Sequence, residues 1–119
     1  MYGWRARIGL IVPPPNTVAE VEWSRMAPEG VSIHAVRMYH QSGPTRLDRE
    51  YLLRTIDSLP HVASTLVPVQ PDMVAMAHTL GSMIRGPGTD DAMIDMLKEN
   101  AGCPAVTVAG ALVKAINEL

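Results

Sequence analysis

The sequence of 119 residues is poor in the features that would connect it with membranes, nucleic acid or an oxidising compartment. Its one cysteine, Cys103, cannot form an internal disulfide, and no second thiol or cluster of histidines suggests a zinc site. No apolar run approaches the roughly 18 to 20 residues that a membrane-spanning helix needs. The 10 Lys and Arg against 12 Asp and Glu form no basic stripe. We therefore expect neither a membrane nor nucleic acid as a partner, and no metal.

The length of the chain limits the number of domains. A chain of this length can build one domain with a real core, so we expect residues 1–119 to form a single domain. The first residues lack the pattern of a secretory signal, and we expect a cytoplasmic location.

The most informative segment is the apolar run Ile8 to Val12, which is followed by Pro13, Pro14, Pro15, Asn16 and Thr17. An apolar, partly β-branched run predicts a strand covered on both faces, which is typical of a parallel sheet flanked by helices. Ligands of such sheets sit beyond the carboxyl ends of the strands. Three prolines restrict the backbone, so they would present Asn16 from a stiff loop. Asn16 is therefore either a ligand-binding amide or the cap of the next helix.

Apolar strand-like runs alternate with helical periods along the rest of the chain, which predicts βαβ units. The expected strands are 6–12, 31–36, 73–77 and 105–108. The expected helices are 18–26, 47–67 with a possible break at Pro60, 89–100 capped by Thr89 or Asp90, and one from about Ala111. The expected connections are a loop at 41–44, a turn at 78–82 that leads into a loop, and a turn at 108–110.

This order predicts an α/β fold, namely a Rossmann-like or flavodoxin-like three-layer unit with a four-stranded parallel sheet. Right-handed crossovers would bring the loops after the first, third and fourth strands to one edge of the sheet. We therefore expect Asn16, the 78–82 turn and the 108–110 turn to converge there.

Three segments carry a resemblance to a known family: 8–17, Arg85-Gly86-Pro87-Gly88 and 104–112. They resemble the maleate cis-trans isomerase and arylmalonate decarboxylase branch of the aspartate/glutamate racemase superfamily. The resemblance implies an active site between two pseudo-symmetric halves, catalytic cysteines or their substitutes, and neither cofactor nor metal. The chain resembles the N-terminal half only, so the cysteine of the second half has no counterpart.

The resemblance also implies which residues form the site. Isomerases of this branch have a Cys-Thr-Ser-Gly-Ser turn, and His78 stands at the cysteine position here. His78 is then the catalytic candidate. Thr79 and Ser82 would hold a carboxylate or enediolate, and Leu80 replaces a residue that would donate. The full set of implied substrate-binding residues is Pro14, Pro15, Asn16, Thr79, Leu80, Gly81 and Ser82.

The candidate residues also have ordinary structural interpretations. His78 could serve as acid or base near neutral pH, or only bond a carbonyl at a strand end. Cys103 precedes a strand at the opposite edge and is expected to be a structural residue. Arg85 is either a carboxylate clamp or a solvated loop residue. His34, His40 and His61 show no ligand spacing.

Two functions remain open from the sequence. The first is a cofactor-independent isomerase or decarboxylase, or half of one, that acts on a small carboxylate or dicarboxylate. The second is a non-catalytic domain that binds carboxylate or another protein. A homodimer could rebuild an arrangement of two halves by symmetry.

Overall fold

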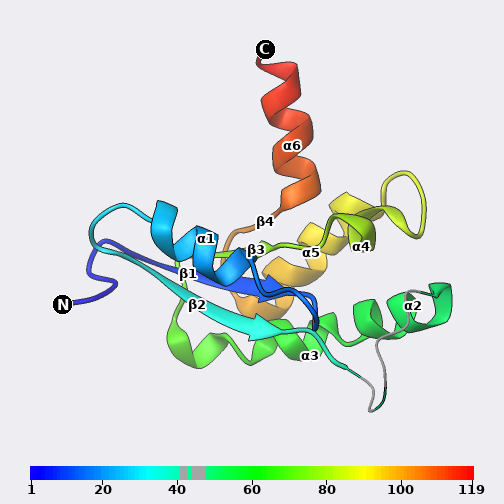
Figure 1. Cartoon of the computed structure of the whole chain (residues 1–119), viewed down its shortest axis with the longest axis horizontal. Coiled ribbons are helices and arrows are strands. Elements are labelled where there is room, and N and C mark those ends of the chain that lie inside the picture. Colours follow the sequence, from blue (N-terminus) through cyan, green and yellow to red (C-terminus); the bar gives the residue numbers. More distant parts are fainter. Residues whose placement is uncertain (41–42, 44–47) are drawn as a thin grey trace.

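The computed structural model describes residues 1–40, 43 and 48–119. These residues contain a four-stranded sheet with helices on both faces (Figure 1). All strand pairs are parallel, and the order is β2-β1-β3-β4. The strands are β1 (Ala6–Val12), β2 (Val31–Arg37), β3 (Met73–Met76) and β4 (Ala105–Thr107). The α/β fold predicted from the sequence is confirmed.

The helices occupy the segments between these strands and the C-terminal segment. They are α1 (Ala19–Met26), α2 (Arg49–Asp57), α3 (Leu59–Ser64), α4 (Thr79–Met83), α5 (Thr89–Ala101) and α6 (Val108–Asn117), with a short 3₁₀ helix, η1, at Val67–Val69.

β1 lies at the centre of the sheet, and its last three residues have no solvent exposure. Leu10 and Val12 point to one face and pack against Ala19 of α1. Ile11 points to the other face and joins the core built with α3 and α5. The apolar run is thus explained by burial on both sides, as expected for an inner parallel strand.

The two helical layers follow from the handedness of the connections. The chain moves from β1 to β2 in one direction across the sheet and from β3 to β4 in the other. Right-handed crossovers therefore place α1 on one face and α3 and α5 on the opposite face (Figure 1). The strand order reverses between β1 and β3, which makes their carboxyl ends the switch point of the fold.

The expected helix over 47–67 is two helices that meet at Ser58. Pro60 does not make the break, because it lies in the first turn of α3, where the missing N–H group is not needed. The expected loop at 41–44 and the expected start of the helix at Leu47 lie outside the described residues, apart from Gly43.

The expected turn and loop at 78–82 is instead the short helix α4. Its start is stabilised by the His78 side chain, which caps it. The expected turn at 108–110 is the first turn of α6, which begins at Val108 because the Thr107 side chain caps it. Both predictions were wrong for the same reason: each cap is a side-chain contact that apolar periodicity does not reveal.

The expected caps of α5, Thr89 and Asp90, were also wrong. Gly88 is the N-cap, with a left-handed backbone at φ 81°. The Thr89 hydroxyl donates to the Gly86 carbonyl, and the Asp90 carboxylate accepts from Thr107. The end expected near residue 100 is confirmed to within one residue, because α5 ends at Ala101 and Gly102 follows it in the left-handed conformation that glycine adopts most easily.

Among the described residues, no helix combines the length and the apolar character needed to cross a membrane.

Candidate active site

The carboxyl ends of β1, β3 and β4 lie side by side. Ile11 pairs with Met76, and Met76 pairs with Thr107. The Ala77 amide also donates to the Ile11 carbonyl across 2.8 Å. The segments that follow these three strands therefore start next to one another at the switch point, where open α/β sheets bind ligands.

Asn16 caps α1, which is one of the two roles expected for it. Its Oδ1 accepts from the amides of Val18 at 3.0 Å and Ala19 at 2.8 Å. These two donors fix the orientation of the side-chain amide, because only the oxygen can accept. The Nδ2 group is then left as a donor, so capping and ligand binding are compatible at this position.

The loop before Asn16 is held by Arg37, a residue that the sequence analysis missed. The Nη1 group of Arg37 donates to the carbonyls of Asn16 at 2.6 Å, Pro14 at 3.3 Å and Pro13 at 3.4 Å. Its Nη2 group pairs with Glu20 of α1. The stiffness expected from the prolines is therefore reinforced by a guanidinium at the end of β2. In the sequence, the only sign of this contact is that an arginine ends the second strand.

His78 stands between β3 and α4. Its Nδ1 accepts a hydrogen bond from the Gly81 amide at 3.1 Å. An imidazole nitrogen that accepts carries no proton, so the neutral ring has its proton on Nε2. Partial burial lowers the pKa of His78 below its ordinary value of 6.5. Both effects favour a neutral imidazole that offers Nε2–H as a donor.

The other residues of this segment differ in exposure. Thr79 and Leu80 are exposed, whereas Gly81 and Ser82 are buried. A Cβ atom on Gly81 would lie 3.3 Å from Cγ of the His78 ring, so the ring packs closely over the glycine. Ser82 has 4% relative exposure, and its hydroxyl has no hydrogen-bond partner within the described structure. Such a group costs free energy unless a bound molecule satisfies it.

Thr107 joins the end of β4 to two helices. Its hydroxyl donates to Oδ1 of Asp90 at 2.7 Å and accepts from the Gly110 amide at 3.0 Å. Thr107 is almost fully buried. A Cβ atom on Gly110 would lie 2.9 Å from Oδ2 of Asp90, so this junction is also sterically tight.

Replacing Thr107 with valine should lower the free energy of unfolding by about 1 to 3 kcal/mol, because Asp90 and the Gly110 amide would lose their partner. Chemical denaturation monitored by circular dichroism measures this change. Thr107→Ser retains the hydroxyl and is the control. Equal losses for the two variants would contradict a role for the hydrogen bonds.

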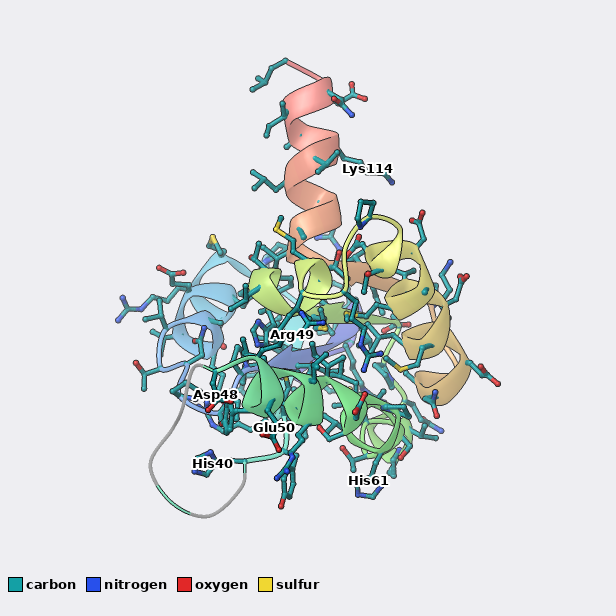
Figure 2. All side chains as sticks on the ribbon, turned by 90° about the vertical axis from the view of Figure 1, so that its right-hand side faces the viewer. His40, Asp48, Arg49, Glu50, His61 and Lys114 are labelled. Carbon is teal, nitrogen blue, oxygen red and sulfur yellow. The ribbon has the colours of Figure 1, made fainter. Side chains whose placement is uncertain are left out.

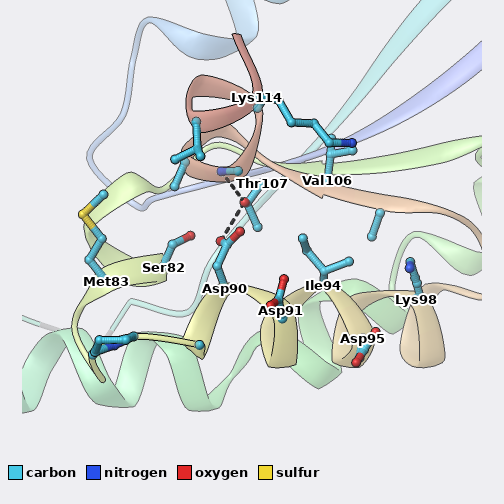
Figure 3. Close-up of a pocket in the computed structure, with 18 residues that line it drawn as sticks. Ser82, Met83, Asp90, Asp91, Ile94, Asp95, Lys98, Val106, Thr107 and Lys114 are labelled. Carbon is cyan, nitrogen blue, oxygen red and sulfur yellow. Dashed lines mark hydrogen bonds between the residues drawn. The ribbon is translucent and has the colours of Figure 1, made fainter. Parts of the chain in front are cut away.

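A groove of about 1000 Å³ opens beside this junction, between α5 and α6 (Figure 3). Its floor includes Val106 and Thr107 of β4, and Ser82 and Met83 line the part next to α4. Ser82 is the one predicted site residue that lines this groove; the others, at the ends of β1 and β3, do not. The groove itself was not predicted from the sequence.

The remaining candidates have local partners. Arg85 pairs with Asp57 of α2. His34 bonds the Ser32 hydroxyl, and His40 bonds the Tyr51 hydroxyl. In the part of the chain that the structure describes, no three acidic, His or Cys side chains are grouped as metal ligands.

Cys103 lies just before β4, at the edge of the sheet opposite His78, and packs against the core. Burial, with a contribution from Asp72, raises the pKa of its thiol. The thiol is therefore a poor nucleophile, in agreement with the structural role predicted for it.

Three comparisons place this geometry among known proteins. The family model described as arylmalonate decarboxylase matches residues 8–119. Among solved structures, the maleate isomerase Iso from Pseudomonas putida has 25% identity and a TM-score of 0.77 and covers 94% of this chain and 48% of that one. No curated protein matches.

Two further solved structures have the same fold. A mutant of the Nocardia farcinica maleate cis-trans isomerase with a covalently bound succinylcysteine intermediate has 24% identity and a TM-score of 0.79, over 94% of this chain and 48% of that one. A liganded double mutant of arylmalonate decarboxylase has 24% identity and a TM-score of 0.80, over 96% and 46%. The chain spans about half the length of these proteins.

Proposed function

The chain belongs to the arylmalonate decarboxylase family, and from this premise we propose that the carboxyl edge of its sheet binds a small carboxylate or dicarboxylate. The observation that carries the proposal is the buried hydroxyl of Ser82, which has no partner among the described residues. It lies in the first segment after β3, next to the switch point. A carboxylate oxygen is an acceptor that would satisfy it.

Other neutral donors lie in the segments that follow β1 and β3 at this edge. They are the Nδ2 group of Asn16, the Nε2–H group of His78 and the exposed hydroxyl of Thr79. Each is neutral, so together they can hold an anion without a buried countercharge. Isomerisation and decarboxylation next to a carboxylate both build negative charge on oxygens, and fixed neutral donors stabilise such charge. We therefore propose a cofactor-independent isomerase or decarboxylase reaction.

His78 enters this proposal as a donor more readily than as a base. A base would need a free lone pair, but the Nδ1 lone pair already accepts from the Gly81 amide. A neutral Nε2–H group is a weak acid and a good hydrogen-bond donor, and an imidazole held neutral can polarise a substrate oxygen in this way.

The Nocardia isomerase mutant carries a succinylcysteine, which is a covalent intermediate on a cysteine. This chain has no thiol at the corresponding edge of the sheet. Cys103 lies at the opposite edge of the sheet. This observation favours the second candidate function, a non-catalytic domain that binds carboxylate. It also fits a chain that acts as the first half of an enzyme of two halves. We propose in addition that the protein is cytoplasmic.

Turnover of maleate, aryl- and alkylmalonates and aspartate, followed by NMR with the protein at high concentration, tests the proposal. We expect turnover or saturable binding of at least one of these carboxylates, and its reduction in Ser82→Ala. Binding without turnover would select the non-catalytic function. Neither binding nor turnover across the panel would contradict carboxylate recognition.

A further inference from the structure

α6 is an apolar helix without a neighbour along most of its length. It rises from the body of the molecule in two perpendicular views (Figures 1 and 2). Residues 111–119 are all exposed, and the side chains of Leu112, Val113 and Ile116 are each more than half exposed. Helices of this composition are normally buried against another element, because water does not stabilise their apolar surface.

The total surface of the chain points to a missing contact of substantial area. The chain exposes 7411 Å². A folded monomer of 12.9 kDa is expected to expose roughly 6300 Å². The excess of roughly 1100 Å² is similar to the roughly 800 Å² that each partner buries in a standard interface.

The groove between α5 and α6 is a second unpartnered surface, next to the first. Ile94 of α5, Val106 of β4 and Val113 of α6 give it an apolar lining. Asp91, Asp95 and Lys98 line it from α5, and Lys114 lines it from α6 (Figure 3). None of these four charged residues forms an ion pair within the described structure. Asp91 and Asp95 are therefore available to a positive charge on a helix that enters the groove.

We propose that this groove receives α6 of a second copy of the chain. Each copy carries both the projecting helix and the groove, so one two-fold arrangement covers both surfaces in both copies at once. α6 of each copy then packs between α5 and α6 of the other.

The charges agree with this arrangement. α6 has one basic residue, Lys114. Seated in the groove of the second copy, this lysine meets the acidic side chains of Asp91 and Asp95 on α5. Opposite charges across an interface fix the register of two helices.

The dimer also bears on Ser82, although it does not depend on the proposed function. Ser82 lines the same groove as Val113. A helix seated there covers the groove side of Ser82, whose hydroxyl is already buried.

Sedimentation velocity of the whole chain from about 1 µM to about 200 µM tests the dimer, because contacts of standard size give dissociation constants within or below this range. We expect a dimer whose dissociation constant rises at least about tenfold in Val113→Glu. Val67→Glu is the matched control: Val67 is similarly exposed, on η1, and should leave association unchanged. A wild-type monomer throughout this range would overturn the proposal, and so would a dimer that the two variants weaken equally.

A charge exchange keeps the test independent of folding. Lys114→Glu should weaken the dimer several-fold through repulsion by Asp91 and Asp95, and adding Asp95→Lys should restore it. Both positions are exposed, so the fold should tolerate both changes, which circular dichroism checks. A double variant that associates no better than Lys114→Glu alone would overturn the proposed position of α6.

Discussion

Replacing His78 with alanine should reduce turnover of a carboxylate substrate by about 10² to 10³, the usual cost of one donor to a developing negative charge. The same change should lower the free energy of unfolding by about 1 kcal/mol, because the Gly81 amide loses the acceptor that caps α4. NMR-detected turnover and chemical denaturation measure the two effects.

His78→Asn separates the two roles of the side chain. Asparagine is a good N-cap and should keep α4 close to wild-type stability, but it lacks the ring nitrogen that donates. We expect this variant to be stable and to remain impaired in turnover. If asparagine restored turnover together with stability, His78 would be a capping residue and nothing more.

The pH dependence of stability gives an independent measure of His78. The unfolded chain takes up a proton on this imidazole near pH 6.5, whereas burial lowers its pKa in the folded protein. Between these two pKa values the unfolded chain therefore binds more protons. The contribution to stability is constant above pH 6.5, falls as the pH drops through 6.5, and levels off below the folded pKa. This fall should be absent from His78→Asn under the same conditions.

Replacing Ser82 with alanine should affect binding and stability in opposite directions. A hydrogen bond to a charged group is worth about 1.5 to 3 kcal/mol, so carboxylate affinity should fall by about tenfold to a hundredfold. Stability should rise by about 1 kcal/mol, because a buried hydroxyl without a partner is removed and alanine favours a helix. Calorimetric titration and thermal denaturation measure the two changes.

Ser64→Ala is the control for Ser82→Ala. Ser64 is exposed on α3, and its hydroxyl donates to the His61 carbonyl at 2.6 Å. Its loss should leave carboxylate affinity unchanged. A stabilised Ser82→Ala protein with wild-type affinity would remove Ser82 from the proposed site and would make its buried hydroxyl a packing defect.

The sheet could be predicted from the sequence because strand signals are local. The run Ile8 to Val12 identifies an inner strand, since only a strand buried on both faces carries apolar residues without alternation. The order of strands and helices then restricts the topology, because crossovers are right-handed. The same logic predicted that Asn16 and the segments 78–82 and 108–110 follow strands that end at one edge of the sheet.

The environment of each site residue could not be predicted in this way. Arg37 meets Asn16 across 21 residues of sequence and Thr107 meets Asp90 across 17. No periodic pattern records a hydrogen bond of that kind. The burial of Ser82 and the groove beside it also depend on how α4, α5 and α6 pack together.

The sequence by itself determined the fold class, the parallel sheet and the edge at which a site can form, because apolar patterning and backbone handedness act over a few residues at a time. Only the tertiary structure decided what each side chain at that edge can do. It turned Asn16 and His78 into caps with one donor group left over, and it left the Ser82 hydroxyl without a partner among the described residues. It also left α6 exposed beside a groove that has an apolar lining and two aspartates. These properties arise from contacts between distant segments, which exist only after the chain has folded.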